Sequence, residues 1–134
     1  MPIVDASVCG AFFNGRELQH VSSRIWFREA RKRDEQVVAP VILLAEVAAA
    51  LGRGLGDAGL ADYAVGVLRS RRWIQLLPVT QALSIRAAKI AAEQKIRGCD
   101  AIYVALAQQL GMELVTLDGD QLDRGAAVVR TRTP

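Results

Sequence analysis

Cysteine and histidine are scarce in this chain of 134 residues, which contains two cysteines, Cys9 and Cys99, and one histidine, His20. Zinc sites and iron–sulfur clusters need several such side chains around one ion or cluster. Zinc fingers, zinc ribbons, iron–sulfur sites and histidine-ligated catalytic zinc are therefore excluded. A chain of this length can bury a core large enough to fold without disulfides or structural metals. We expect a single domain spanning residues 1–134.

Long apolar runs are also missing. The longest charge-free apolar stretch, residues 37–45, is far shorter than the roughly 18 residues of a membrane span. Asp5 interrupts the apolar segment that a signal peptide would need at the start of the chain. We therefore expect no membrane-spanning segment and a cytoplasmic location.

Charge of one sign is not in large excess, because the formal net charge is only +3. Arginine accounts for 14 of the 17 basic residues, and its guanidinium is a good bidentate partner for phosphate. Such a slight basic excess fits a nucleic-acid-binding surface and an arginine- and alanine-rich genome equally well.

Short apolar runs alternate with helical segments along the whole chain. Strands are expected at residues 2–5, 37–38, 73–77, 113–117 and 126–129. Helices are expected at residues 7–13, 19–33, 40–51 (with Pro40 in the first position), 60–70, 80–95 and 100–110, and a turn or short helix at 118–123. This alternation predicts an α/β fold with a mainly parallel sheet between helices on both faces. Ligands of such sheets bind at the carboxyl ends of the strands.

A glycine-rich string at residues 54–59 matches the G-x-G-x-x-G pattern of dinucleotide-binding folds. Its context is wrong, because the string follows a helix instead of leaving a strand and opening a helix. We therefore interpret these glycines as the end of a helix and a turn.

Four acidic residues stand among apolar neighbours. Asp5 and Asp118 follow expected strands, Asp100 starts an expected helix, and Glu46 lies in the middle of an apolar helix. An ionised carboxylate is costly to bury without a compensating cation. The carboxyl ends of parallel strands and the starts of the following helices meet at one edge of a sheet, so these acids are expected to converge there.

Each acid also has a plainer explanation when taken alone. Asp5 and Asp100 could be helix N-caps, and Asp118 could be a turn residue. Glu46 could form a structural ion pair, for which Arg53 is the only candidate on its helical face. One shared explanation accounts for all of them: clustered carboxylates repel one another, and hard divalent cations such as Mg²⁺ or Mn²⁺ relieve that repulsion. Such a site suits metal-assisted phosphoryl chemistry.

The order and context of these acids resemble the PIN-domain ribonucleases, and specifically VapC-type toxins of bacterial type II toxin–antitoxin pairs. The resemblance is carried by four segments: Val4-Asp5-Ala-Ser7, Leu44-Ala-Glu46-Val, Cys99-Asp100-Ala-Ile-Tyr-Val-Ala-Leu-Ala and Val115-Thr-Leu-Asp118. It implies a PIN-like three-layer α/β/α fold and an Mg²⁺- or Mn²⁺-dependent endoribonuclease, in which metal-activated water attacks an RNA phosphodiester. It also implies a homodimer and a tight complex with a small antitoxin protein.

By the same resemblance, Asp5, Glu46, Asp100 and Asp118 are the catalytic acids, and they hold one or two metal ions. Ser7 and Thr116 match supporting polar positions. These families commonly have Asp-x-x-Leu after the last acid, whereas this chain has Asp118-Gly-Asp120-Gln-Leu122. That departure leaves Asp120 as a substitute for Asp118 or as a fifth acid.

Two other functions compete with this interpretation. One is a catalytically inactive PIN-like module that binds RNA or protein, and the other is a nuclease acting on DNA or flap structures. Trp26, Trp73 and Tyr103 are expected in the core, although they could stack on bases. The sequence leaves open which of nine arginines contact RNA: Arg16, Arg24, Arg28, Arg53, Arg69, Arg71, Arg72, Arg86 and Arg97.

Overall fold

The computed structural model describes residues 1–70 and 72–134, so Arg71 lies outside the described residues. Its sheet has the strand order β3-β2-β1-β4-β5, and every pairing is parallel. The strands are β1 (Pro2–Val4), β2 (Val38–Pro40), β3 (Gln75–Leu77), β4 (Glu113–Val115) and β5 (Thr131–Arg132). The helices are α1 (Ala6–Phe13), α2 (His20–Lys32), α3 (Leu43–Gly54), α4 (Ala58–Arg69), α5 (Gln81–Gln94), α6 (Gly98–Leu110) and α7 (Gly119–Arg124).

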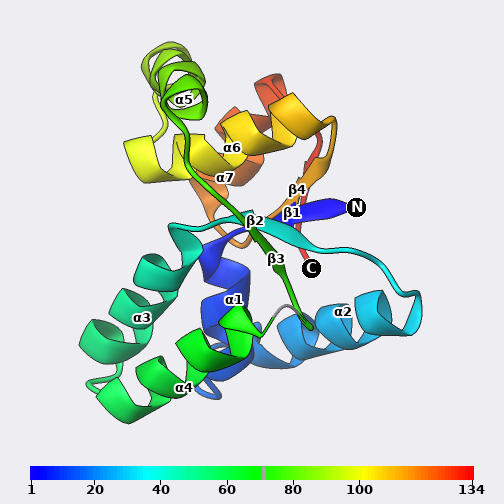
Figure 1. Ribbon diagram of the computed structural model, residues 1–134, viewed down its shortest axis with the longest axis vertical. Helices are drawn as coiled ribbons and strands as arrows, with labels where there is room; N and C mark the ends of the chain where they lie inside the picture. The colour runs from blue at the N-terminus through cyan, green and yellow to red at the C-terminus, as the bar shows by residue number, and fades with distance from the viewer. Residues whose placement is uncertain (71) are drawn as a thin grey trace.

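The helices form a layer on each face of the sheet, as the sequence predicts. In Figure 1, helices α1 to α4 lie on one side of the strands and α5 to α7 on the other. Helix α6 packs against β1, β2 and β4, and β1 contributes the fully buried Ile3 and Val4. The expected three-layer α/β/α arrangement is therefore confirmed. None of the helices in the described part of the chain is long and apolar enough to cross a membrane.

The chain changes direction across the sheet between β1 and β4. From β1 it proceeds outward through β2 to β3, and it then returns to place β4 on the other side of β1. In open α/β sheets, such a switch point leaves a crevice beyond the carboxyl ends of the two central strands. Asp5 follows β1 directly, and its N–H extends the pairing by donating to the carbonyl of Val115 at 3.3 Å.

Pro40 was expected to open a helix, and that prediction is wrong. Pro40 ends β2 and pairs with Leu77, and the following helix begins only at Leu43. The N–H of Val41 donates to the carbonyl of Leu77 at 2.8 Å, so the pairing with β3 requires no donor from Pro40. A proline is tolerated in a strand where its missing N–H is not needed.

The last strand was also misplaced. Residues 126–129 were expected to form it, but Gly125–Ala127 form a 3₁₀ turn, and the N–H groups of Val128 and Val129 both donate to the Gly125 carbonyl. The strand is β5, which lies beyond the residues in which a strand was expected. It is aligned by the N–H of Leu114, which donates to the Arg130 carbonyl at 2.8 Å.

Helix α6 starts earlier than expected, at Gly98. Asp100 therefore lies inside its first turn and is not its N-cap, which corrects one of the plainer explanations of this residue. Gly111 ends the helix in the left-handed conformation at φ 64°, which a residue without a Cβ adopts readily.

Two glycine substitutions test these helix assignments. Gly111→Ala should lower the free energy of unfolding by about 1 kcal/mol, because a Cβ is strained at positive φ. Gly66→Ala, within α4 and with open space around the added Cβ, should raise it by about 0.5 to 1 kcal/mol through helix propensity. Urea denaturation measures both changes, and equal effects of the two substitutions would contradict the assigned conformation of Gly111.

Candidate active site

The four acids predicted from the sequence line one cavity of about 220 Å³. Asp5 follows β1, Glu46 comes from α3, Asp100 from α6, and Asp118 lies between β4 and α7. The other lining residues are Ala6, Ser7, Ala50, Arg97 and Tyr103. The expected convergence at the carboxyl edge of the sheet is thus present, and each acid has its own set of partners.

Asp5 is the most deeply buried of the acids, with 3% of its surface exposed. Its Oδ1 accepts from the Ser7 hydroxyl at 2.5 Å and from the Val8 N–H at 3.4 Å, and its Oδ2 accepts from the Thr116 hydroxyl at 2.8 Å. Burial nevertheless raises the pKa of Asp5 from 3.8 to about 6. Asp5 is therefore both the N-cap of α1 and a wall of the cavity, so the two explanations are compatible.

Ser7 and Thr116 connect the ends of β1 and β4. The Ser7 hydroxyl accepts from the Leu117 N–H at 2.9 Å, and the Thr116 hydroxyl accepts from the Asp118 N–H at 3.0 Å. Each hydroxyl thus accepts from the chain that follows β4 and donates to Asp5. This geometry fits a supporting role in positioning the carboxylates.

Glu46 is bound by a phenol and not by Arg53, the candidate partner in its plainer explanation. The Tyr103 hydroxyl donates to Glu46 Oε1 at 2.5 Å. Burial raises the pKa of Glu46, and burial next to this carboxylate raises the pKa of Tyr103 far above its ordinary value, so the phenol remains a donor. Tyr103 is a core residue, as expected, but its role at the cavity was missed because the sequence does not show that α6 faces α3 there.

Arg97 binds the two remaining acids of the cavity. Its Nε donates to Asp100 Oδ2 at 2.8 Å, and its Nη2 donates to Asp118 Oδ2 at 3.1 Å. The other oxygen of Asp100 accepts from Gln121 Nε2 at 3.0 Å, and Asp118 Oδ1 accepts from the Gln121 N–H as the N-cap of α7. Sequence reasoning left Arg97 among nine unresolved arginines, and it missed the buried Gln121 altogether.

Asp120 does not line this cavity. Its carboxylate is 57% exposed and lies 4.0 Å from Arg124, one helical turn away. Asp118 lines the cavity and Asp120 does not, which favours Asp118 as the fourth acid of the cavity.

The donor set fits a hard divalent cation. Four carboxylates and the adjacent hydroxyl of Ser7 offer only oxygen atoms, which are the ligands that Mg²⁺ and Mn²⁺ prefer. Among residues 1–70 and 72–134, however, no three acidic, cysteine or histidine side chains are grouped as ready-made metal ligands. The carboxylates are instead engaged by Arg97, Gln121, Tyr103 and hydroxyl groups, so ion binding would require some of these contacts to be exchanged.

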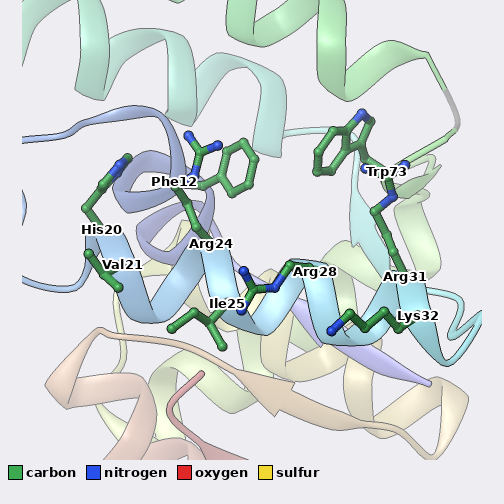
Figure 2. Close-up of a pocket in the computed structure, with 9 residues that line it drawn as sticks. All are labelled: Phe12, His20, Val21, Arg24, Ile25, Arg28, Arg31, Lys32 and Trp73. Carbon is green, nitrogen blue, oxygen red and sulfur yellow. The ribbon is translucent and has the colours of Figure 1, made fainter.

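A larger hollow of about 710 Å³ lies along α2 (Figure 2). Four basic side chains of α2 line it, and Phe12 and Trp73 stand opposite the helix. The guanidinium of Arg24 lies 5.1 Å from the centre of the Phe12 ring, and that of Arg31 lies 4.6 Å from the Trp73 ring. We call this hollow the α2 groove; its lining residues are Phe12, His20, Val21, Arg24, Ile25, Arg28, Arg31, Lys32 and Trp73.

A third hollow lies along α1 beside the acidic cavity. It shares Ala6, Ser7, Ala50 and Asp118 with the acidic cavity and extends to Gln19 at the start of α2. The next residue along the chain, His20, lines the α2 groove. The third hollow therefore borders the acidic cavity directly and ends one residue along the chain from the lining of the α2 groove.

The raised pKa of Asp5 predicts how stability depends on pH. Because the folded protein binds the Asp5 proton more tightly than the unfolded chain, the stability that this group contributes is complete below pH 4 and is lost as the pH rises through 6. The loss should be about 3 kcal/mol in EDTA. Asp5→Asn should abolish most of this fall, as measured by urea unfolding at several pH values. Asp62→Asn, an exposed acid of α4, serves as the control that keeps the wild-type profile, and an unchanged profile in Asp5→Asn would contradict the assignment.

Comparison with known proteins gives matches to one family and one fold. The family model described as PIN domain matches residues 3–127. The structure of VapC20 from Mycobacterium tuberculosis, described as a sarcin-ricin loop cleaving toxin, superposes with a TM-score of 0.80 at 22% identity, covering 100% of both chains. FitAcB from Neisseria gonorrhoeae has a TM-score of 0.72 at 19% identity, covering 100% of this chain and 98% of that chain.

A toxin–antitoxin complex from Klebsiella pneumoniae gives a TM-score of 0.65 at 21% identity, again over 100% of this chain and 98% of the other. The comparison with curated proteins yields no significant match. At sequence identities of 19 to 22%, the superpositions establish the fold alone. The family model establishes the family, because it matches residues 3–127, which is nearly the whole sequence. The parallel sheet, the helical layers and the family match lead to one conclusion: the chain belongs to the PIN domain family and has the fold of VapC-type toxins.

Proposed function

We propose that this protein is the toxin of a toxin–antitoxin pair and a metal-dependent endoribonuclease. The observation that carries the proposal is the meeting of Asp5, Glu46, Asp100 and Asp118 in one cavity at the switch point of the sheet. Membership of the PIN domain family and the likeness to toxin structures support it. The protein would act in the cytoplasm, as a homodimer, on RNA.

The metal would be held by the carboxylates of Asp5, Glu46, Asp100 and Asp118. A bound Mg²⁺ or Mn²⁺ supplies a cation that activates water and offsets the charge of the attacked phosphate. The chain's own groups keep the carboxylates in place: Ser7 and Thr116 orient Asp5, and Tyr103 orients Glu46. A bound cation also lowers the pKa of a neighbouring carboxyl group, which would keep Asp5 ionised near neutral pH.

The likeness to one solved structure narrows the class of RNA that we propose as the substrate. VapC20, which superposes over its full length, is described as cleaving the sarcin-ricin loop. Sequence-specific RNA recognition acts mostly on unstacked bases in loops. A structured RNA with a single-stranded loop is therefore the proposed substrate class, and a sarcin-ricin loop oligonucleotide is the first substrate to test.

Purified protein should cut this oligonucleotide in Mg²⁺ or Mn²⁺ and should lose the activity in EDTA. Asp100→Asn should lower the rate by about 100-fold or more, since even second-shell changes at metal sites cost 10- to 100-fold. Asp62→Asn is the matched control, because it makes the same substitution at an exposed acid of α4 and should leave the rate unchanged. Electrophoresis of the products measures the rate, and products with 5′-phosphate and 3′-hydroxyl ends are expected.

Cleavage that persists after chelation would rule out the metal mechanism. Metal-dependent binding of the oligonucleotide without cleavage would favour the inactive RNA-binding module. Cleavage of single-stranded or flap DNA in preference to RNA would favour the third function considered above.

The antitoxin partner fits the α2 groove. Arg24, Arg28, Arg31 and Lys32 present positive charge there, and Val21 and Ile25 are 64% and 43% exposed beside them. An acidic, amphipathic protein segment would satisfy both features, because its carboxylates pair with the basic side chains and its apolar side chains cover Val21 and Ile25, whereas an RNA backbone presents mainly phosphates and hydroxyls. We therefore propose that an acidic segment of the antitoxin binds here and extends along α1 toward the acidic cavity.

Charge reversal tests this surface. Arg24→Glu combined with Arg28→Glu should weaken binding of the small protein encoded next to this gene by about 100-fold or more, because like charges then face each other across the interface. The change in Kd, followed by calorimetry, should be largest at low ionic strength. Arg69→Glu combined with Arg86→Glu is the matched control on other helices. Equal effects of the two double variants, or stronger loss of RNA binding than of antitoxin binding, would contradict the proposed occupant.

A further inference from the structure

Among the described residues that line the cavity, Arg97 alone carries positive charge. It lies between two of the acids, with its Nε 2.8 Å from Asp100 Oδ2 and its Nη2 3.1 Å from Asp118 Oδ2. The two carboxylate oxygens that point toward the guanidinium belong to different segments, α6 and the turn after β4. Arg97 therefore offsets the repulsion between two carboxylates that the fold brings together.

The contacts of Arg97 can be broken at low cost. Its side chain is 72% exposed, whereas those of Asp100 and Asp118 are 10% and 24% exposed. Water solvates the free guanidinium well, and a metal bound to the two carboxylates would replace the positive charge that they lose. Arg97 is also the N-cap residue of α6 without a side-chain capping bond, so the helix does not depend on its side chain.

The two acids retain other partners when Arg97 leaves. Gln121 Nε2 still donates to Asp100 Oδ1, and the Gln121 N–H still donates to Asp118 Oδ1. Each carboxylate is thus held through its Oδ1, and its Oδ2 becomes available to another cation. A metal ligand oxygen lies about 2.0 to 2.1 Å from Mg²⁺, which leaves no room for a guanidinium on the same oxygen in the same direction.

We propose that Arg97 is a built-in competitor of the divalent cation: it holds Asp100 and Asp118 in the metal-free protein and must leave both carboxylates for the metal to bind. This inference rests on the proposed metal-dependent function. It explains why the described acids share one cavity without forming a ready-made ligand group. The metal ion must displace Arg97 from the two carboxylates before it binds. Its apparent affinity is therefore lowered by the free energy of the Arg97 contacts that are broken.

Metal affinity measured without RNA tests the proposal. Arg97→Gln removes the positive charge and keeps a polar side chain, so Mn²⁺ should bind roughly five- to tenfold more tightly than to the wild type. Arg97→Lys should fall between the two, because an ammonium is a point charge and lacks the fork that reaches both acids. Arg69→Gln removes the same charge from the exposed end of α4 and should bind Mn²⁺ as the wild type does. Calorimetry or electron paramagnetic resonance of Mn²⁺ gives the Kd, and a thermal melt confirms that each variant is folded.

The outcomes separate this inference from the function on which it rests. Mn²⁺ binding that is unchanged or weaker in Arg97→Gln, with clear binding to the wild type, would overturn the competition and leave the metal site intact. No Mn²⁺ binding to any of these proteins would overturn the metal site and the inference together. If Arg97→Gln does not fold, an affinity of Arg97→Lys equal to or weaker than that of the wild type would overturn the proposal in the same way.

Discussion

Repulsion among carboxylates in one cavity is the constraint on which the rest of this site depends. The parallel sheet reverses its order between β1 and β4, and this topology brings Asp5, Glu46, Asp100 and Asp118 to one place. Such a concentration of negative charge costs free energy unless protons or cations offset it. The neighbouring side chains can be understood as different responses to this cost.

Those responses divide the cavity into two parts. Asp5 and Glu46 are bound by neutral donors, namely the hydroxyls of Ser7, Thr116 and Tyr103, and burial raises the pKa of both acids. The charge of Asp100 and Asp118 is instead offset by Arg97, whose own side chain is exposed. The two responses differ in how easily they are reversed, because an exposed guanidinium can leave and return, whereas the hydroxyl network is kept together by the fold.

The acidic cavity and the α2 groove have opposite charge, and α1 connects them. Asp5 at the N-cap of α1 lies in the cavity, while Phe12 in the last turn lines the groove. Phe12 also packs at 5.2 Å from Trp73 and 5.3 Å from Phe27, between the centres of the rings, so the groove rests on an aromatic part of the core. A partner bound in the groove would therefore contact a surface that rests on the packed core at one end of α1, while the acidic cavity lies at the other end of that helix.

The sequence by itself determined the fold class and the identity of the clustered acids. Runs such as residues 2–4 and 114–117, which are mostly apolar, are recognisable as strands, and a charged residue in an apolar context, such as Glu46, signals a site because its burial needs a partner. The tertiary structure decided which groups those partners are. Tyr103 reaches Glu46 across 57 residues of the chain, and both Arg97 to Asp118 and Gln121 to Asp100 span 21 residues, so the packing of α6 and α7 around the sheet selects these contacts. The same limit explains the errors at Pro40 and at residues 126–129, because strand ends depend on hydrogen bonds to a neighbouring strand, which local sequence does not specify.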